Sequence, residues 1–321
     1  MTQIDETAEA ASARLVSLVM PAFSPRPVWL RTAVYSALGQ RGWPVELIIV
    51  DDGSPKPVAE LLDDVEDSRL RIVRVPHGGV AEARNAGIAA ARGAYMRFID
   101  ADDVFDRDST ARLAMLIAGR RDVIAYGATL FCDEHLRPLF KVTARRQGDV
   151  VIACLLDRFP AVLPAMLFPR AVVDATGAWD PQLTVCEDWD WVLRALEHAR
   201  VLGVRDVAAW YRRHAASASH LDAPAWDGAV RVVQGYFERH PEQRGTHVER
   251  SARAMLSFMR ATHRPRRQIW RSHYFWRAAL LDPLAVLNGV GGLLRDGRVG
   301  RTVYSLSPRT RPQLQAPDPP H

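Results

Sequence analysis

In the first hundred residues, short apolar runs rich in β-branched residues alternate with stretches of helical period, and this alternation narrows the possible folds more than any other feature. Four runs predict strands, and the three stretches between them predict helices. The predicted strands are residues 14–23, 45–54, 70–75 and 94–100, and the predicted helices are residues 27–40, 57–67 and 80–93. Strands that are apolar throughout are typical of a parallel sheet covered on both faces. The chain therefore predicts an α/β fold with a mainly parallel sheet flanked by helices.

Polar motifs follow three of these predicted strands. The first strand leads into MPAFS, the second into DDGS and the fourth into DADD. Ligands of such sheets bind at the carboxyl ends of the strands, which all lie along one edge. We therefore expect the three motifs to line one crevice.

The rest of the chain is less regular. Strands are predicted at residues 122–131 and 201–214, a strand and short helix within residues 165–180, and a clear helix over residues 187–200. The pattern then turns helical from about residue 223 to residue 281, and the Pro-rich end is typical of disorder. We divide the chain into a flexible N-terminus, an α/β domain, a helical C-terminal region and a disordered tail: residues 1–13, 14–222, 223–304 and 305–321.

Composition limits the class of protein. Of the 321 residues, 48% are hydrophobic, which is enough for a sizeable core. No apolar run of about 18 residues or more occurs, and the start of the chain is acidic where a signal peptide would be basic. We therefore expect a cytoplasmic protein. The three cysteines are widely spaced, which argues against a metal cage or redox pair.

Basic and aromatic residues gather near the C-terminus. Residues 260–301 contain nine arginines and only two acidic residues, with Trp270, Tyr274 and Trp276 among them. Such a segment is typical of a packed helix with a solvated arginine face, of a helix lying on an anionic membrane, or of a nucleic-acid site. We favour the packed helix, keep peripheral contact at the inner membrane face as a hypothesis, and expect no nucleic-acid partner.

The DADD motif admits two interpretations. Two carboxylates at i and i+2, Asp100 and Asp102, can bind Mg²⁺ or Mn²⁺, whose remaining ligands can be diphosphate oxygens. Aspartates are also common in turns and at helix N-caps, so a polar turn without a metal is the alternative.

Five further residues have similar alternatives. Asp52 of DDGS can contact a ligand or satisfy turn amides, and Arg84 after two glycines can pair with a phosphate. The acidic pair Glu187–Asp188 can supply a general base or simply favour a helix start. His214 can be a metal ligand or a surface residue.

The order of the motifs is more specific than any one of them. VMPAF, IIVDDGS, GGVAEARNAG, FIDADD, EDWDWVLR and YRRH, in this order over residues 14–220, closely resemble the family 2 glycosyltransferases of GT-A fold. The resemblance implies a Rossmann-like nucleotide-diphospho-sugar transferase fold with a helical C-terminal extension. The chain departs from the family at Ser24–Pro25 and at PHGG, so the sugar pocket is not predicted.

The resemblance also implies a nucleotide pocket. Asp52 matches the aspartate that recognises the base, and Asp100 matches the one that lies toward the ribose. The other residues implied near the nucleotide are Pro21, Ala22, Phe23 and Arg84.

Metal and catalytic roles follow from the same resemblance. Asp102 matches the ligand of Mn²⁺ or Mg²⁺, and His214 lies toward the metal and diphosphate. Asp188 matches the catalytic base, with Glu187 in support, while we expect Asp103 to orient or cap the turn.

The implied reaction is a metal-dependent single displacement with inversion, as in a hexosyltransferase or related enzyme. The donor is a nucleotide-diphosphate sugar, with uridine as the base by family habit, and the acceptor is a glycan or a lipid-linked molecule of polysaccharide, cell-wall or glycolipid synthesis. Two alternatives remain: a non-catalytic sugar-nucleotide-binding protein of the same fold, and a metal-dependent nucleotidyltransferase. The second would need a basic, glycine-rich triphosphate loop, which MPAFSPRP does not supply.

Overall fold

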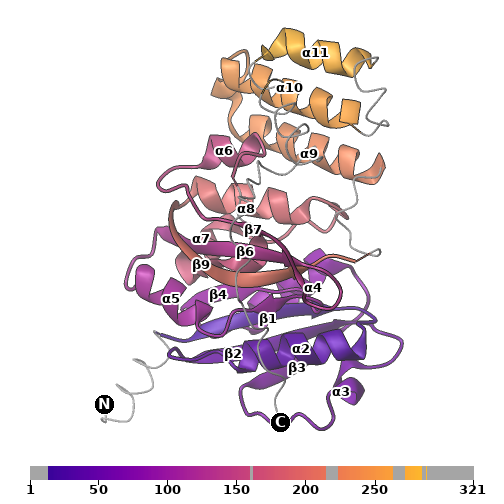
Figure 1. Ribbon diagram of the computed structural model, residues 1–321, viewed down its shortest axis with the longest axis vertical. Helices are drawn as coiled ribbons and strands as arrows, with labels where there is room; N and C mark the ends of the chain where they lie inside the picture. The colour runs from indigo at the N-terminus through magenta and orange to yellow at the C-terminus, as the bar shows by residue number, and fades with distance from the viewer. Residues whose placement is uncertain (1–13, 160–161, 215–222, 263–271, 284–286, 288–321) are drawn as a thin grey trace.

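The computed structural model describes residues 14–159, 162–214, 223–262, 272–283 and 287, which form a nine-stranded mixed sheet between helices and a helical stack at one end (Figure 1). The strands are β1 (Val16–Ala22), β2 (Val45–Asp52), β3 (Leu70–Val75), β4 (Tyr95–Phe98), β5 (Val104–Phe105), β6 (Val123–Cys132), β7 (Pro138–Val142), β8 (Met166–Pro169) and β9 (Arg200–Arg212). The helices are α2 (Pro27–Leu38), α3 (Val58–Leu61), α4 (Val80–Ala90), α5 (Ser109–Leu116), α6 (Val151–Leu155), α7 (Arg170–Thr176), α8 (Glu187–Glu197), α9 (Ala223–Arg239), α10 (His247–Thr262) and α11 (His273–Leu281).

The N-terminal half confirms the predicted alternation of strands and helices. Strands β3, β2, β1 and β4 pair in parallel in that order. Leu18 of β1 belongs to the core shared with α2 and α5, and the next residue, Val19, belongs to the core shared with α4, α7 and α8. Gly87 lets α4 lie directly on the sheet, because a Cβ there would clash with Val19. Helices therefore cover both faces, and the carboxyl ends of β1, β2 and β4 share one edge.

Beyond β4 the sheet is mixed, whereas the sequence predicted mainly parallel strands. The order continues β8-β6-β9-β5, and β8 runs antiparallel to both β4 and β6, while β6 and β9 are parallel. Apolar character predicts that a strand is buried on both faces but not the direction in which it runs. The short strands β5 and β7 and the helices α5 and α6 were not predicted.

Helix α3 is much shorter than predicted. The amphipathic stretch 57–67 forms a helix only over Val58–Leu61, and Val58 is its one buried residue. A single turn gains little from backbone hydrogen bonds, so it persists only through its packing. Leu62 and Val65 after it still pack on the core, but outside the helix.

The C-terminal helices stack away from the sheet. Helix α9 joins the core of α8, α10 packs on α9, and α11 packs on α10 (Figure 1). No helix in the described ranges is long and apolar enough to cross a bilayer. The predicted flexible N-terminus and disordered tail, residues 1–13 and 305–321, lie outside the described residues. The division at residues 222–223 stays a prediction.

Arg97 of β4 is a buried cation close beneath the DADD turn. Its side chain is fully buried, and its guanidinium donates to Ser109 Oγ, Thr110 Oγ1 and two backbone carbonyls at 2.8–3.2 Å. It lies 3.8 Å from the ring centroid of Phe105. Burial lowers the pKa of Arg97 to about 9. The residue thus ties β4 to α5 and β9 through neutral acceptors.

Candidate active site

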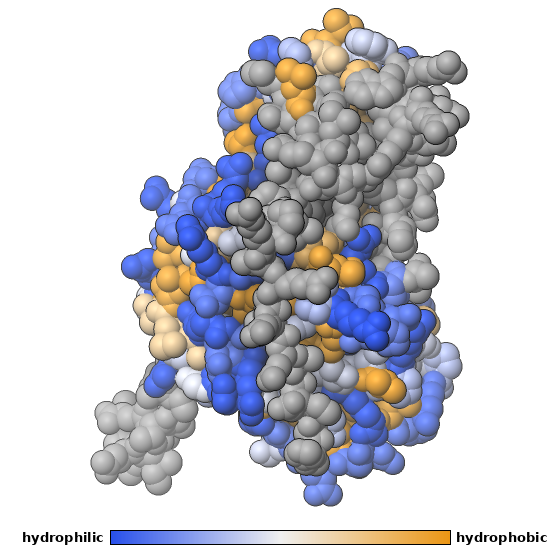
Figure 2. All heavy atoms as spheres, in the orientation of Figure 1, coloured by the Kyte–Doolittle hydropathy of each residue, from blue (hydrophilic) through white to orange (hydrophobic). Residues whose placement is uncertain are grey.

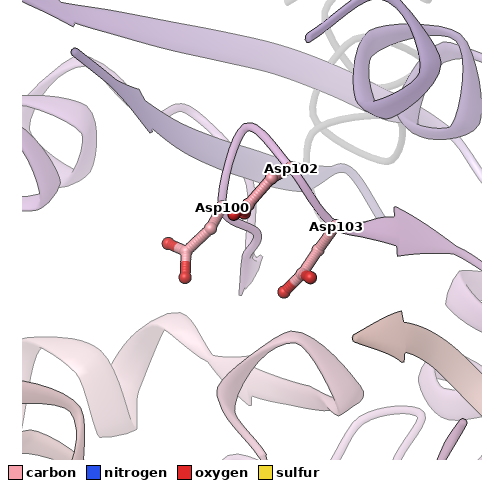
Figure 3. Close-up of side chains that lie close together, drawn as sticks. All are labelled: Asp100, Asp102 and Asp103. Atoms are coloured by element: carbon pink, nitrogen blue, oxygen red, sulfur yellow. The ribbon is translucent and has the colours of Figure 1, made fainter. Parts of the chain in front are cut away.

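The DADD turn leaves the carboxyl end of β4 and gathers three carboxylates (Figure 3). One oxygen from each of Asp100, Asp102 and Asp103 lies within 4.8 Å of the others. The turn is closed by a hydrogen bond of 3.1 Å from the Asp103 amide to the Asp100 carbonyl. Three carboxylate oxygens at this spacing suit a hard divalent cation, which takes oxygen ligands.

Asp103 is the buried member of the cluster. It is 1% exposed, and its Oδ1 accepts the backbone N–H of Arg212 at 2.8 Å, which joins the turn to β9. Its Oδ2 has no hydrogen-bond partner in the described part of the chain. Burial, together with the charges of Asp102 and Asp100, raises the pKa of Asp103 well above its ordinary value. A cation beside the carboxylate would relieve this repulsion.

His214 follows β9 and reaches the same turn. Its Nε2 lies 2.8 Å from Asp102 Oδ2, and its side chain is 9% exposed. Its ring is 4.7 Å from that of Trp29 on α2, and Trp29 in turn lies under the guanidinium groups of Arg26 and Arg212. His214 is therefore part of the site and not a surface residue. Trp29 was not predicted; its position just after the first motif was the only sequence signal.

Arg84 connects the two acidic motifs. The residue is 3% exposed, and its Nη2 and Nη1 lie 2.9 Å from Asp100 and from Glu187. It also lies 4.6 Å above the ring of Trp179. Burial alone would lower the pKa of Arg84. The charges of Asp100 and Glu187 outweigh this effect of burial, so the pKa of Arg84 is raised above its ordinary value. Its guanidinium thus lies between a carboxylate of the DADD turn and a carboxylate of α8.

Helix α8 begins at the second acidic motif, Glu187–Asp188. Asp188 Oδ1 accepts the backbone N–H of Trp189 at 2.8 Å. Burial and the charge of Asp188 raise the pKa of Glu187 despite the nearby Arg84. The residue before the helix, Cys186, has a left-handed conformation with φ 62°, which a non-glycine residue holds only where its surroundings impose it.

Gly228 of α9 lies against this helix start. A Cβ on Gly228 would come 2.7 Å from the Val185 carbonyl oxygen and 3.4 Å from Cys186 Sγ. The close approach requires glycine, so the C-terminal helices support the segment that carries Asp188.

The DDGS motif holds the loop before α4. Asp52 is 3% exposed and accepts the amides of Gly78 and Gly79 at 2.8 and 3.0 Å, with His77 Nδ1 at 2.9 Å. The ring of His77 stacks on that of Phe23, with centroids 4.2 Å apart, and Phe23 is 50% exposed. The motif therefore satisfies loop amides, which was one of its two interpretations, and leaves an aromatic pair exposed beside it.

Comparison with known proteins agrees with this geometry. Residues 17–159 match the family described as glycosyl transferase family 2. The fold is accordingly the GT-A fold, as the structural comparison also shows: the crystal structure of Staphylococcus aureus TarS 1–349 in complex with UDP-GlcNAc has a TM-score of 0.56 at 14% identity, over 88% of this chain and 92% of that one.

Curated relatives match shorter segments of the chain. The uncharacterized glycosyltransferase EpsJ of Bacillus subtilis is 38% identical over 91 residues, or 28% of this chain and 26% of the relative. A Haemophilus influenzae uncharacterized glycosyltransferase is 30% identical over 138 residues, 42% of this chain and 55% of that one. The succinoglycan biosynthesis protein ExoO of Rhizobium meliloti is 36% identical over 99 residues, 30% of this chain and 28% of that one. The matches thus span from about a quarter to about half of each relative's length.

The segment that matches the family 2 model and the acidic motif of α8 come from separate parts of the chain. Asp52, Arg84 and the DADD turn lie within the matched residues, while Glu187–Asp188 and His214 lie beyond them. Arg84 bridges to Glu187, and Asp102 contacts His214, so the fold brings both later motifs to the turn. Pro21 and Ala22 are buried in β1, directly before Phe23.

Proposed function

We propose that this chain is an inverting glycosyltransferase that moves a sugar from a nucleotide-diphosphate sugar to an acceptor hydroxyl in a metal-dependent single displacement. The observation that carries the proposal is the link made by Arg84 between Asp100 of the DADD turn and Glu187 beside Asp188. One buried cation thereby holds a candidate metal and nucleotide site next to a candidate base.

The donor set fits Mn²⁺ or Mg²⁺. We assign Asp102 and His214 as ligands, and the unpartnered buried oxygen of Asp103 marks a place where positive charge would be favoured. A bound cation would offset the negative charge that develops on the diphosphate leaving group.

The nucleotide is assigned to the side of the turn near β1 and β2. Phe23, half exposed and stacked on His77, offers a flat face to the base. Asp52 orders the glycine loop beside it, and Asp100 lies toward the ribose. Pro21, Ala22 and Arg84 complete this pocket.

Asp188 is assigned as the general base. It would take the proton of the acceptor hydroxyl as that oxygen attacks the anomeric carbon opposite the leaving diphosphate, and one such displacement inverts the anomeric configuration. Glu187 and Arg84 support this side of the site by fixing the start of α8.

The substrate classes rest on the named relatives. The TarS crystal structure contains UDP-GlcNAc, and the ExoO relative is named for succinoglycan biosynthesis. We therefore assign a UDP-sugar as donor and a glycan or lipid-linked acceptor of polysaccharide synthesis.

Asp102→Ala tests the metal assignment. Calorimetric titration with UDP is expected to show that Mn²⁺ strengthens binding to the unchanged protein, and that this gain falls about tenfold or more in the variant, because contacts with charged groups contribute on the order of 1.5–3 kcal/mol. Asp63→Ala, which removes an exposed carboxylate far from the turn in sequence, is the matched control and should bind as before. An unchanged affinity in Asp102→Ala would remove that residue from the metal site.

Incubation with Mn²⁺ and a panel of sugar nucleotides or nucleoside triphosphates separates the enzyme classes. We expect hydrolysis or transfer of a sugar nucleotide. Turnover of triphosphates alone would favour the nucleotidyltransferase, and binding without any turnover would favour the non-catalytic protein.

Helix α11 is the candidate membrane contact. Trp276 and Leu280, four residues apart, are 58% and 87% exposed, and Arg277 lies between them. Figure 2 shows hydrophobic atoms at the surface of the α11 end of the molecule. We propose that this face lies on an anionic bilayer, since exposed aromatic and aliphatic residues beside arginine are typical of interfacial helices.

Vesicles containing phosphatidylglycerol should bind the protein at low salt but bind Trp276→Ala/Leu280→Ala weakly; equal binding of both proteins would contradict the proposal.

A further inference from the structure

A basic cavity lies at the edge of the sheet opposite the DADD turn. Its volume is about 630 Å³, and its lining includes Arg92, Arg120, Arg121 and Arg170 with Tyr95 and Pro169. Tyr95 is the first residue of β4, whereas the DADD turn follows the last. The five steps along the chain from Tyr95 to Asp100 span about 16 Å when extended, so the cavity is separate from the proposed catalytic site.

Two of the four arginines are held in place by carboxylates outside the cavity lining. Arg92 pairs with buried Glu46 through both Nε and Nη2, at 2.9 and 2.8 Å. Arg170 donates from Nε to Asp174 at 2.9 Å and from Nη1 to the Ala91 carbonyl at 3.0 Å. A guanidinium has five N–H donors, so each keeps donors that these contacts do not use.

The other two arginines lie on a turn that is fixed to β4. Gly119, with φ 75°, lies in the turn that follows α5, and its amide donates to the hydroxyl of buried Tyr95 at 3.3 Å. Arg120 and Arg121 are exposed, and no ion pair is found for either within the described ranges. No carboxylate is among the residues that line the cavity. Arg120 and Arg121 therefore add positive charge that no ion pair within the described ranges offsets, whereas Arg92 and Arg170 are already paired.

We propose that this cavity binds a phosphate-bearing ligand. Guanidinium groups form paired, charge-assisted hydrogen bonds with phosphate oxygens, and four of them around one hollow match a diphosphate or phosphate ester better than a single small anion. The volume lies within the range of sites for small ligands. Neither the ligand nor the site depends on the sugar-transfer reaction.

Calorimetric titration of the full chain with inorganic pyrophosphate, in EDTA so that no divalent cation contributes, tests the proposal. Saturable binding is expected, and Arg120→Gln/Arg121→Gln should weaken it about tenfold or more. The matched control is Arg231→Gln/Arg250→Gln, which removes the same charge from exposed positions on α9 and α10 and should leave the affinity within about twofold, because such distant charges are screened. Equal weakening by both pairs, or no saturable binding, would overturn the proposal.

Hydrogen exchange gives a second readout that does not depend on the variants. Pyrophosphate should slow exchange in residues 91–95 and 119–122; slowing elsewhere but not there would also overturn the proposal. Vesicles containing phosphatidic acid distinguish the source of the phosphate. If Arg120→Gln/Arg121→Gln lowers vesicle binding as well as pyrophosphate binding, the ligand is a lipid headgroup; if only pyrophosphate binding falls, it is a soluble phosphate compound.

Discussion

Asp188→Asn is expected to lower the rate of sugar transfer by about two to four orders of magnitude, the range that a general base contributes. An asparagine side chain cannot take the proton of the acceptor hydroxyl. It keeps the oxygen that accepts the Trp189 amide at 2.8 Å, so the start of α8 should stay in place. Affinity for UDP with Mn²⁺, measured by calorimetry, should therefore remain near that of the unchanged protein.

Asp190→Asn is the matched control for this prediction. Asp190 lies two residues further along α8. Its carboxylate forms an ion pair with Arg194 of the same helix at 2.8 Å. Because the pair lies outside the proposed catalytic contacts, its loss should change the transfer rate by only a few-fold. Full transfer activity in Asp188→Asn would exclude Asp188 as the base, and loss of UDP binding in that variant would show a structural role instead.

Arg97→Ala is expected to lower the free energy of unfolding by about 3–5 kcal/mol, the range for truncation of a large buried side chain. The change leaves a cavity under β4 and removes the donor from Ser109 Oγ, Thr110 Oγ1 and two carbonyls, which stay buried without it. Urea denaturation followed by tryptophan fluorescence measures the loss.

Arg69→Ala is the comparison for Arg97→Ala. Arg69 pairs with Asp67 at the surface, at 2.7 Å, and the pair should contribute less than about 1 kcal/mol. Both variants remove one arginine charge. The difference between their losses in free energy of unfolding therefore measures the effect of burying the Arg97 side chain. A loss in Arg97→Ala as small as in Arg69→Ala would show that the buried hydrogen bonds of Arg97 do not stabilise the fold.

The parallel half of the fold was predictable because its signals are local. A β-branched apolar run followed by a stretch of helical period predicts a βαβ unit within about thirty residues, and β1 to β4 follow that pattern. The common edge of their carboxyl ends then predicted where DDGS and DADD would lie. The direction of β8 was not predictable, because it depends on which strands flank it.

The residues of the candidate site were also predictable from the sequence, but their contacts were not. The acidic residues and Arg84 were identified from the order of the motifs, but the structure pairs Arg84 with carboxylates and gives the oxygens of Asp52 to loop amides. Asp103 was expected only to fix the turn, yet it also supplies an oxygen to the three-carboxylate cluster. The support of His214 by Trp29 had no signal beyond an aromatic residue after the first motif.

The α/β class, the family resemblance and the residues of the acidic motifs could be identified from the residues alone, because hydrophobic period and motif order are properties of neighbouring residues. How those motifs meet could be known only from the folded chain. Arg84 joins Glu187 across 103 positions of chain, and Asp102 meets His214 across 112. Contacts at such separations depend on how strands and helices pack, and no local pattern encodes that packing.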